Sequence, residues 1–251
     1  MSSLFWNKYL GDSSSKQLMV IFIGDSITFG ANHFNPRSTA PPVIASNLIQ
    51  EQLKGTKVHF VNCGKNGSTT SDFLPDGRHL FLSVQKAANR FLKYDNSSRE
   101  IIFSIMLGTN DSARKGVDGM PVFPNQYQIN MKTIINELLK LYPECKVVLQ
   151  KPIWFSNNAY NGENYMQDAL DRLITYHPAI DSLVKDYSTT KPNAVFLGDL
   201  EGFDHFKNNY LTDHIPEKGN TGTYYLHPNK KGAAKLGELW AKSILRVISI
   251  Q

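Results

Sequence analysis

Leu18-Met19-Val20-Ile21-Phe22-Ile23-Gly24-Asp25-Ser26 joins an unbroken apolar run to a sharp turn, and it decides the fold class of this chain. A short apolar run rich in β-branched residues is typical of a strand buried on both faces of a parallel sheet. Gly24 allows the backbone to change direction abruptly after such a strand. The pattern predicts a central strand followed at once by a helix, with the Ser26 hydroxyl presented at the turn between them.

Four further runs of this kind follow along the chain, and each is expected to be a strand. They are Lys57–Asn62, Ile101–Leu107, Lys146–Gln150 and Ala194–Leu197. Apolar residues at helical spacing lie between these runs and after the last of them. The expected helices are Pro42–Leu53, Leu80–Phe91, Gln126–Leu141, Met166–Tyr187 and Asn229–Ile248.

Strands that alternate with helices imply right-handed crossovers and a parallel sheet with helices on both faces. We therefore expect a three-layer α/β/α fold with a flavodoxin-like five-stranded sheet in the order 2-1-3-4-5. The length of 251 residues suits a single domain covering residues 1–251. The Pro41-Pro42 pair and Ser156–Glu163 are expected to be surface loops.

The net charge and the apolar content limit the kinds of partner and the cellular compartment that we expect for this protein. The net charge is +5, but the basic residues are dispersed, and Lys230-Lys231 is the densest pair. We expect no nucleic-acid partner, because no recognition motif accompanies this charge. No apolar run approaches the ~20 residues of a membrane helix. Met1–Lys16 lacks the basic region and the long apolar stretch that are typical of a secretory signal peptide. These features favour a cytoplasmic protein, or a secreted one whose leader has been trimmed.

The chain has two cysteines, Cys63 and Cys145, both near the ends of expected strands. Two cysteines are too few for a disulfide framework, and neither has a base beside it in the sequence. We expect both to pack as small apolar residues.

Four short polar segments carry the candidate chemistry, and three of them follow expected strands. They are Gly24–Gly30, Asn62–Thr70, Gly108–Asp111 and His227–Asn229. Because loops at the carboxyl ends of parallel strands meet at one edge of the sheet, these segments are expected to converge. Together they offer a hydroxyl nucleophile, oxyanion donors and an imidazole base.

Each segment also has a structural interpretation when taken alone. Asp25-Ser26 could cap a helix, Asn66-Gly67 could be a plain turn, and Asn110 could cap the next helix. The other six histidines stand in no motif, and we interpret them as surface or packing residues. They are His33, His59, His79, His177, His205 and His214.

The order and spacing of the four segments resemble the SGNH (GDSL-type) hydrolase superfamily, from Ile23 to the final helix. The resemblance implies that Ser26 is the nucleophile and that its N–H is one oxyanion donor. It implies that Gly67 and Asn110 are the other two donors and that His227 is the general base. These roles agree with those suggested by the residue types themselves.

One position departs from the family pattern. Members typically carry an aspartate three residues before the histidine, and here that position is Tyr224. Either Ser26 and His227 act as a dyad, or a backbone carbonyl or a different acid orients the imidazole. The nearest acids in the sequence are Asp213 and Glu217, and Asp204 lies further back.

We expect no cofactor and no metal, because the chain has neither a P-loop nor a dinucleotide fingerprint nor metal-ligand spacing. The expected function is a serine esterase acting on short-chain, chiefly acetyl, esters. The segment Leu107–Ser112 with Gln150-Lys151-Pro152 resembles members that deacetylate carbohydrates, which makes a small-molecule or saccharide ester the expected partner. A short-chain carboxylesterase or lipase-like enzyme is the first alternative, and a catalytically silent binding domain is the second.

Aromatic residues after the fourth strand bear on the substrate. They are Trp154, Phe155, Tyr160 and Tyr165. These rings could stack on sugars, or they could roof an apolar site. The sequence does not indicate the oligomeric state.

Overall fold

The computed structural model describes residues 16–76, 80–93, 99–115, 120–159 and 165–249. Its centre is a parallel five-stranded sheet in the order β2-β1-β3-β4-β7. The strands are β1 Lys16–Gly24, β2 Thr56–Gly64, β3 Arg99–Met106, β4 Lys146–Leu149 and β7 Val195–Leu197. In chain order these five are the sheet's first to fifth strands, so the predicted order 2-1-3-4-5 is confirmed.

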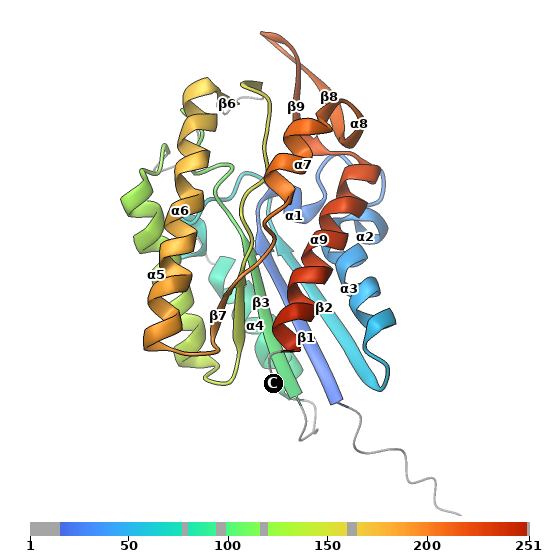
Figure 1. The fold of residues 1–251 in the computed structure, drawn as a ribbon, viewed down its shortest axis with the longest axis vertical. Helices are drawn as coiled ribbons and strands as arrows, with labels where there is room; N and C mark the ends of the chain where they lie inside the picture. Colours follow the sequence, from blue (N-terminus) through green and yellow to red (C-terminus); the bar gives the residue numbers. More distant parts are fainter. Residues whose placement is uncertain (1–15, 77–79, 94–98, 116–119, 160–164, 250–251) are drawn as a thin grey trace, which may run out of the picture.

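Helices cover both faces of the sheet and give the predicted three-layer α/β/α architecture (Figure 1). One face packs against α4 Leu80–Leu92, α5 Pro124–Leu141 and α6 Gln167–Thr190. The other face packs against α3 Pro41–Gln52 and α9 Lys230–Ile248, which lie side by side. All five predicted helices are present, with ends that shift by three residues at most.

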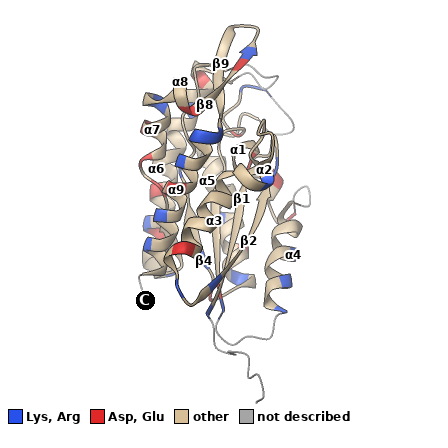
Figure 2. Ribbon diagram, turned by 90° about the vertical axis from the view of Figure 1, so that its right-hand side faces the viewer, with Lys and Arg blue, Asp and Glu red and all other residues tan. Residues whose placement is uncertain are grey.

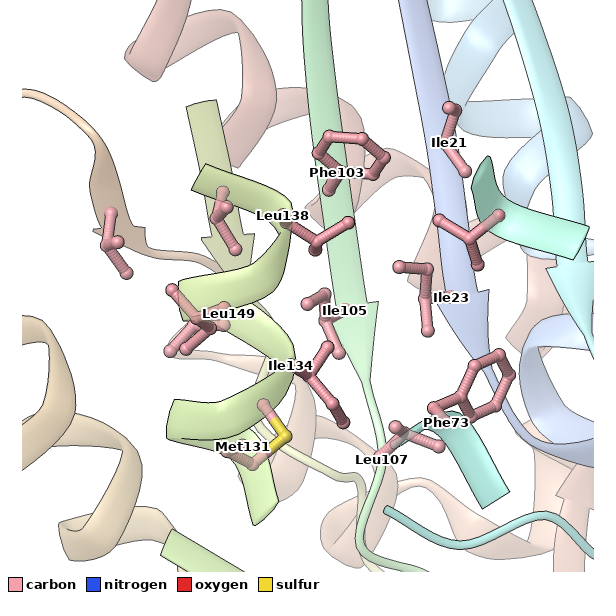
Figure 3. Close-up of a cluster of buried hydrophobic side chains, with 14 of the residues drawn as sticks. Ile21, Ile23, Phe73, Phe103, Ile105, Leu107, Met131, Ile134, Leu138 and Leu149 are labelled. Atoms are coloured by element: carbon pink, nitrogen blue, oxygen red, sulfur yellow. The ribbon is translucent and has the colours of Figure 1, made fainter. Parts of the chain in front are cut away.

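Alternation along the central strands supplies both cores, because successive side chains of a strand point to opposite faces. On β1, Met19, Ile21 and Ile23 enter the larger core, while Leu18, Val20 and Phe22 enter the smaller one. In the larger core, Ile134 and Leu138 of α5 pack over the sheet (Figure 3). Trp240 of α9 stacks on Phe22 on the opposite side, with ring centroids 5.7 Å apart.

Both cysteines lie in or against the larger core. Burial raises the pKa of each thiol to about 12, so both remain protonated at neutral pH. The interpretation of Cys63 and Cys145 as packing residues is confirmed.

Two expectations about loops were wrong in the part of the chain that the structure describes. Pro41-Pro42 is buried and forms the first turn of α3, a position that tolerates proline because those N–H groups have no helical partner. Within Ser156–Glu163, Ser156 is buried and Asn158–Ala159 forms a short strand, β5, which pairs with β6 Tyr165–Met166. The rest of that stretch, residues 160–163, lies outside the described residues.

The sequence patterns did not predict a second small sheet, the antiparallel hairpin of β8 His214–Gly219 and β9 Gly222–Pro228. It lies beyond the carboxyl ends of the parallel strands, near α7 Gly202–Asn208 and α8 Tyr210–Asp213 (Figure 1). The hairpin ends directly in α9, whose Asn229 cap accepts hydrogen bonds from the N–H groups of Lys231 and Gly232.

The surface charges are dispersed. Lysine and arginine are scattered over the elements, and so are aspartate and glutamate (Figure 2). Within the described ranges, none of the helices has the length and apolar character needed to cross a membrane.

Candidate active site

The site begins where three neighbouring strands end at the same level. Gly24 of β1 pairs with Gly64 of β2 on one side and with Met106 of β3 on the other. The loops that follow these strands therefore start from one edge, as the sequence patterns predicted. These loops carry Ser26, Gly67 and Asn110.

The turn after β1 is compact because Gly24 has no side chain. A Cβ on Gly24 would lie 2.0 Å from the Thr28 hydroxyl and 2.7 Å from the Met106 carbonyl oxygen. Ser26 then opens the single-turn helix α1, Ser26–Phe29, which Asp25 caps by accepting a hydrogen bond from the Ile27 N–H. Asp25 therefore does have the capping role considered above, while the Ser26 hydroxyl is directed to a different partner.

That partner is His227. Its Nε2 lies 3.0 Å from Ser26 Oγ, although the two residues are 201 positions apart in the chain. His227 belongs to β9, and the backbone just after it is fixed on two sides. His33 contacts the Pro228 carbonyl at 3.0 Å, and the Asn229 N–H donates to the Asp213 carbonyl.

The second imidazole nitrogen faces Glu217. His227 Nδ1 lies 2.9 Å from Glu217 Oε1, and the His227 backbone N–H donates to the same oxygen. Glu217 lies on β8 opposite Tyr224 of β9. The hairpin register thus brings an acid ten residues before His227 into contact with its ring.

Two other side chains hold the second oxygen of this carboxylate. Asn32 Nδ2 donates to Glu217 Oε2 at 3.2 Å, and the Tyr224 hydroxyl donates to it at 3.4 Å. Asn32 adopts φ = +65°, a left-handed conformation that asparagine tolerates better than most residues. Tyr224, which occupies the family's usual acid position, here contacts the acid.

The other two candidate acids lie elsewhere. Asp213 is buried, with Oδ2 2.8 Å from His205 Nε2 and Oδ1 2.6 Å from Lys231 Nζ. These partners and the Thr212 hydroxyl lower its pKa to about 2 against the opposing effect of burial. Asp204 is exposed on α7. Of the three candidates, the structure brings Glu217 alone to within hydrogen-bonding distance of the His227 ring.

The loops that carry Gly67 and Asn110 are tied to the Ser26 turn. The Ser68 hydroxyl contacts the Gly24 carbonyl at 3.1 Å, and Asn110 Nδ2 donates to the Ser68 carbonyl at 2.8 Å. Gly67 adopts φ = +74°, and a Cβ there would meet no atom within 4 Å. Glycine at this position therefore serves backbone conformation rather than close packing.

Two buried carboxyl groups lie in the same loops. Burial raises the pKa of Asp25 to about 6, partly offset by the Ile27 N–H. Burial also raises the pKa of Asp111 to about 7; hydrogen bonds from Thr70 lower it, and the charge of Asp25 raises it. Neither acid was singled out from the sequence, where both look like ordinary helix-cap aspartates.

Two of the aromatic residues that follow β4 are buried. Phe155 and Tyr165 are each only 1% exposed and pack edge to face in a third apolar cluster, so neither ring is free to stack on a sugar. Half-buried Trp154 packs against Tyr210 and His214. Tyr160 and His79 lie outside the described residues.

The remaining histidines that carried no motif are held by neighbours. His33 bridges Thr39 and the Pro228 carbonyl, His177 contacts the Pro152 carbonyl, and buried His214 packs on Phe206. His59 packs against Phe91 and His205 contacts Asp213. These contacts are those of packing and structural residues.

A serine, a histidine and a carboxylate in hydrogen-bonding sequence at the carboxyl edge of a parallel sheet form an arrangement suited to acyl transfer. Comparison with known proteins agrees with this class. Residues 22–235 match the model of the GDSL-like Lipase/Acylhydrolase family. The chain belongs to this family and is a carboxylic ester hydrolase.

Solved structures with the same fold cover nearly the whole chain. An aryl esterase from M. smegmatis has 16% identity and a TM-score of 0.60, with 91% of this chain and 99% of that chain covered. Est24, a carbohydrate acetylesterase from Sinorhizobium meliloti, has 16% identity and a TM-score of 0.56, with the same coverage. An acetylxylan esterase from Geobacillus stearothermophilus has 18% identity and a TM-score of 0.60, with 95% and 96% covered. A search of curated proteins gives no significant match.

Proposed function

We propose that this protein is a serine esterase that removes short acyl groups, chiefly acetyl, through an acyl-serine intermediate. The observation that carries the proposal is a chain of two contacts through His227. Its Nε2 lies 3.0 Å from Ser26 Oγ, and its Nδ1 lies 2.9 Å from Glu217 Oε1. An imidazole placed between a hydroxyl and a carboxylate can take the hydroxyl proton while the carboxylate stabilises the ring that becomes charged.

In this mechanism Ser26 Oγ attacks the ester carbonyl carbon as His227 Nε2 accepts its proton. The tetrahedral oxyanion is held by the N–H groups of Ser26 and Gly67 and by the Asn110 side-chain amide. Collapse of the intermediate breaks the ester C–O bond, and His227 returns the proton to the leaving alcohol. Water then attacks the acyl-serine by the same route, and the carboxylic acid is released.

The proposed acid is Glu217, which replaces the aspartate that the family usually carries three residues before the histidine. A Nδ1–H that donates to Glu217 fixes the tautomer in which Nε2 is free to accept the Ser26 proton. Because Asn32 and Tyr224 hold the far oxygen, the carboxylate is oriented before substrate arrives. The site then has a complete triad and does not work as a Ser26–His227 dyad.

The proposed preference for acetyl groups and for saccharides draws on the structural relatives. Two of the structural relatives are named for acetyl esters of carbohydrates. Of the described aromatic rings after β4, Phe155 and Tyr165 are buried and cannot stack on a sugar, while Trp154 is half-buried. The alternative is a carboxylesterase or lipase-like enzyme that prefers longer acyl chains.

The test compares p-nitrophenyl acetate with p-nitrophenyl octanoate, using the wild type and Ser26→Ala, followed by acetylated xylo-oligosaccharides. We expect a higher kcat/KM for acetate, release of acetate from the oligosaccharides, and loss of turnover in Ser26→Ala. A serine-directed phosphonate should label Ser26. Undiminished turnover by Ser26→Ala would refute the mechanism, and a preference for octanoate would favour the lipase-like alternative.

A further inference from the structure

The Asn110 side chain is held from both ends of its amide. Nδ2 donates to the Ser68 carbonyl at 2.8 Å, and Oδ1 accepts a hydrogen bond from the Tyr165 hydroxyl. Asn110 is 3% exposed and Tyr165 is 1% exposed, so bulk water does not compete for these bonds. Since an amide can place either its oxygen or its nitrogen toward a neighbour, such bonds decide which group faces the reacting ester.

We propose that Tyr165 is a positioning residue for the oxyanion hole, an inference that rests on the function proposed above. An amide NH₂ has two hydrogens, and the Ser68 carbonyl uses one of them. The tyrosine bond fixes rotation of the amide plane, so that the second N–H keeps its direction toward the developing oxyanion. Donation to Oδ1 also polarises the amide and strengthens Nδ2 as a donor.

The surroundings of Tyr165 favour this role over simple packing. The tyrosine lies on β6, which pairs with β5, and β5 is bonded in turn to the hairpin that carries the base. The Ser156 N–H donates to the Tyr225 carbonyl, and the Tyr225 N–H donates to the Ser156 hydroxyl, both at 2.9 Å. The element that orients the oxyanion donor is therefore fastened to β9, which carries His227.

The packing of the ring is separable from the bond made by its hydroxyl. The ring contacts Phe155 edge to face with centroids 5.5 Å apart, and a phenylalanine at position 165 would keep that contact. Tyr165→Phe removes the hydroxyl alone. We expect kcat to fall about tenfold, the factor that corresponds to the net free energy of one hydrogen bond, with KM nearly unchanged.

A matched control exists on α6. The Tyr187 hydroxyl donates to Asn136 Oδ1 at 2.6 Å, the same pair of groups near the carboxyl end of the helix and away from the site. Tyr187→Phe should leave kcat unchanged, although it removes a tyrosine–asparagine bond that is part-buried. The comparison separates loss of a tyrosine–asparagine bond elsewhere in the protein from loss of the bond to Asn110.

The deciding experiment is a double-mutant cycle with p-nitrophenyl acetate. Asn110→Ala should lower kcat by about 10²–10³, the usual effect of losing one oxyanion donor. Adding Tyr165→Phe to Asn110→Ala should then change kcat no further, because the amide that Tyr165 orients is gone. The affinity of a boronic acid that forms a tetrahedral serine adduct should fall in Tyr165→Phe by the same factor as kcat.

The possible failures are distinguishable. The positioning role would be overturned if kcat were unchanged in Tyr165→Phe. It would also be overturned if Tyr165→Phe lowered kcat equally in the wild type and in Asn110→Ala. Either result would leave the proposed mechanism intact. If Asn110→Ala itself kept full kcat, the oxyanion assignment in the proposed function would fail first. Should Tyr165→Phe fold poorly, the boronate affinity of its folded fraction still decides between these outcomes.

Discussion

In the proposed triad, Glu217 is the residue at which this chain differs most clearly from the family pattern. Replacing it by glutamine keeps the shape but presents a neutral amide to His227 Nδ1. We expect Glu217→Gln to lower kcat by about 10³–10⁴, as loss of the orienting acid does in other triads. The measurement is steady-state hydrolysis of p-nitrophenyl acetate, with exposed Asp204→Asn as the control. Near-normal activity in Glu217→Gln would indicate a Ser26–His227 dyad.

Asn32 supports the same carboxylate and can be removed without straining the backbone. Its φ of +65° suits glycine, so Asn32→Gly deletes the amide and keeps the conformation. We expect kcat to fall about 10–100-fold, the effect of losing one hydrogen bond to a charged group, and less than in Glu217→Gln. Kinetics in Glu217→Gln and in the double variant would show whether Asn32 acts through Glu217. An equal decrease in kcat on Asn32→Gly in the wild type and in Glu217→Gln would contradict that route.

At the scale of elements, the turn between β1 and α1 depends on the absence of a side chain at Gly24. A Cβ there would collide with Thr28 and with the backbone of β3. We expect Gly24→Ala to destabilise the protein by about 1–3 kcal/mol through overpacking, and to misplace Ser26. Gly67→Ala is the comparison, because it meets open space and bears only the cost of positive φ. Urea unfolding of both variants checks the ranking, and a larger loss for Gly67→Ala would contradict it.

The central sheet and its five helices could be predicted from the sequence because their signals are local. β1 is apolar from Leu18 to Ile23, and α9 repeats apolar residues on one side. The β8–β9 hairpin was missed because His-Ile-Pro-Glu-Lys-Gly has one aliphatic residue and an internal proline. Its turn, Gly219-Asn220-Thr221-Gly222, does carry the residues typical of hairpins, and it is the signal that could have revealed the element.

The candidate site was predictable only where its residues stand in family positions. Ser26 and His227 follow from the motifs. Glu217, Asp213 and Asp204 are equivalent in the sequence, and only the hairpin register distinguishes them. Asn32 and the bond from Tyr165 to Asn110 join segments far apart in the chain, so no local pattern indicates them.

For the whole molecule, the buried acids make stability depend on pH. A carboxyl group whose pKa is raised by folding stabilises the native state at low pH, and that contribution is lost as the pH rises through the folded-state value. For Asp111 the pKa rises from 3.8 to about 7, so the loss occurs between about pH 4 and pH 7. The upper limit of this loss of folding stability is about 4 kcal/mol.

Asp111→Asn tests this dependence. Asparagine keeps an acceptor for the Thr70 N–H and hydroxyl and carries no charge. Relative to the wild type, the variant should gain free energy of unfolding as the pH is raised from 4 to 8. Urea titrations at several pH values measure the difference, with Asp204→Asn as the control. Parallel pH profiles for Asp111→Asn and the wild type would show that the buried charge does not govern stability.

The acid on β8 has a consequence for how enzymes like this one are recognised. A search pattern that requires an aspartate three residues before the histidine passes over this chain, which carries Tyr224 there. In the proposed triad the acid and the base are related by a pairing across two strands: Glu217 faces Tyr224, and His227 follows Tyr224 on the same strand. A search pattern that requires a glutamate, then a turn flanked by glycines, and then a tyrosine three residues before the histidine would find such chains. It would also keep them from being discarded as inactive for lack of the usual acid.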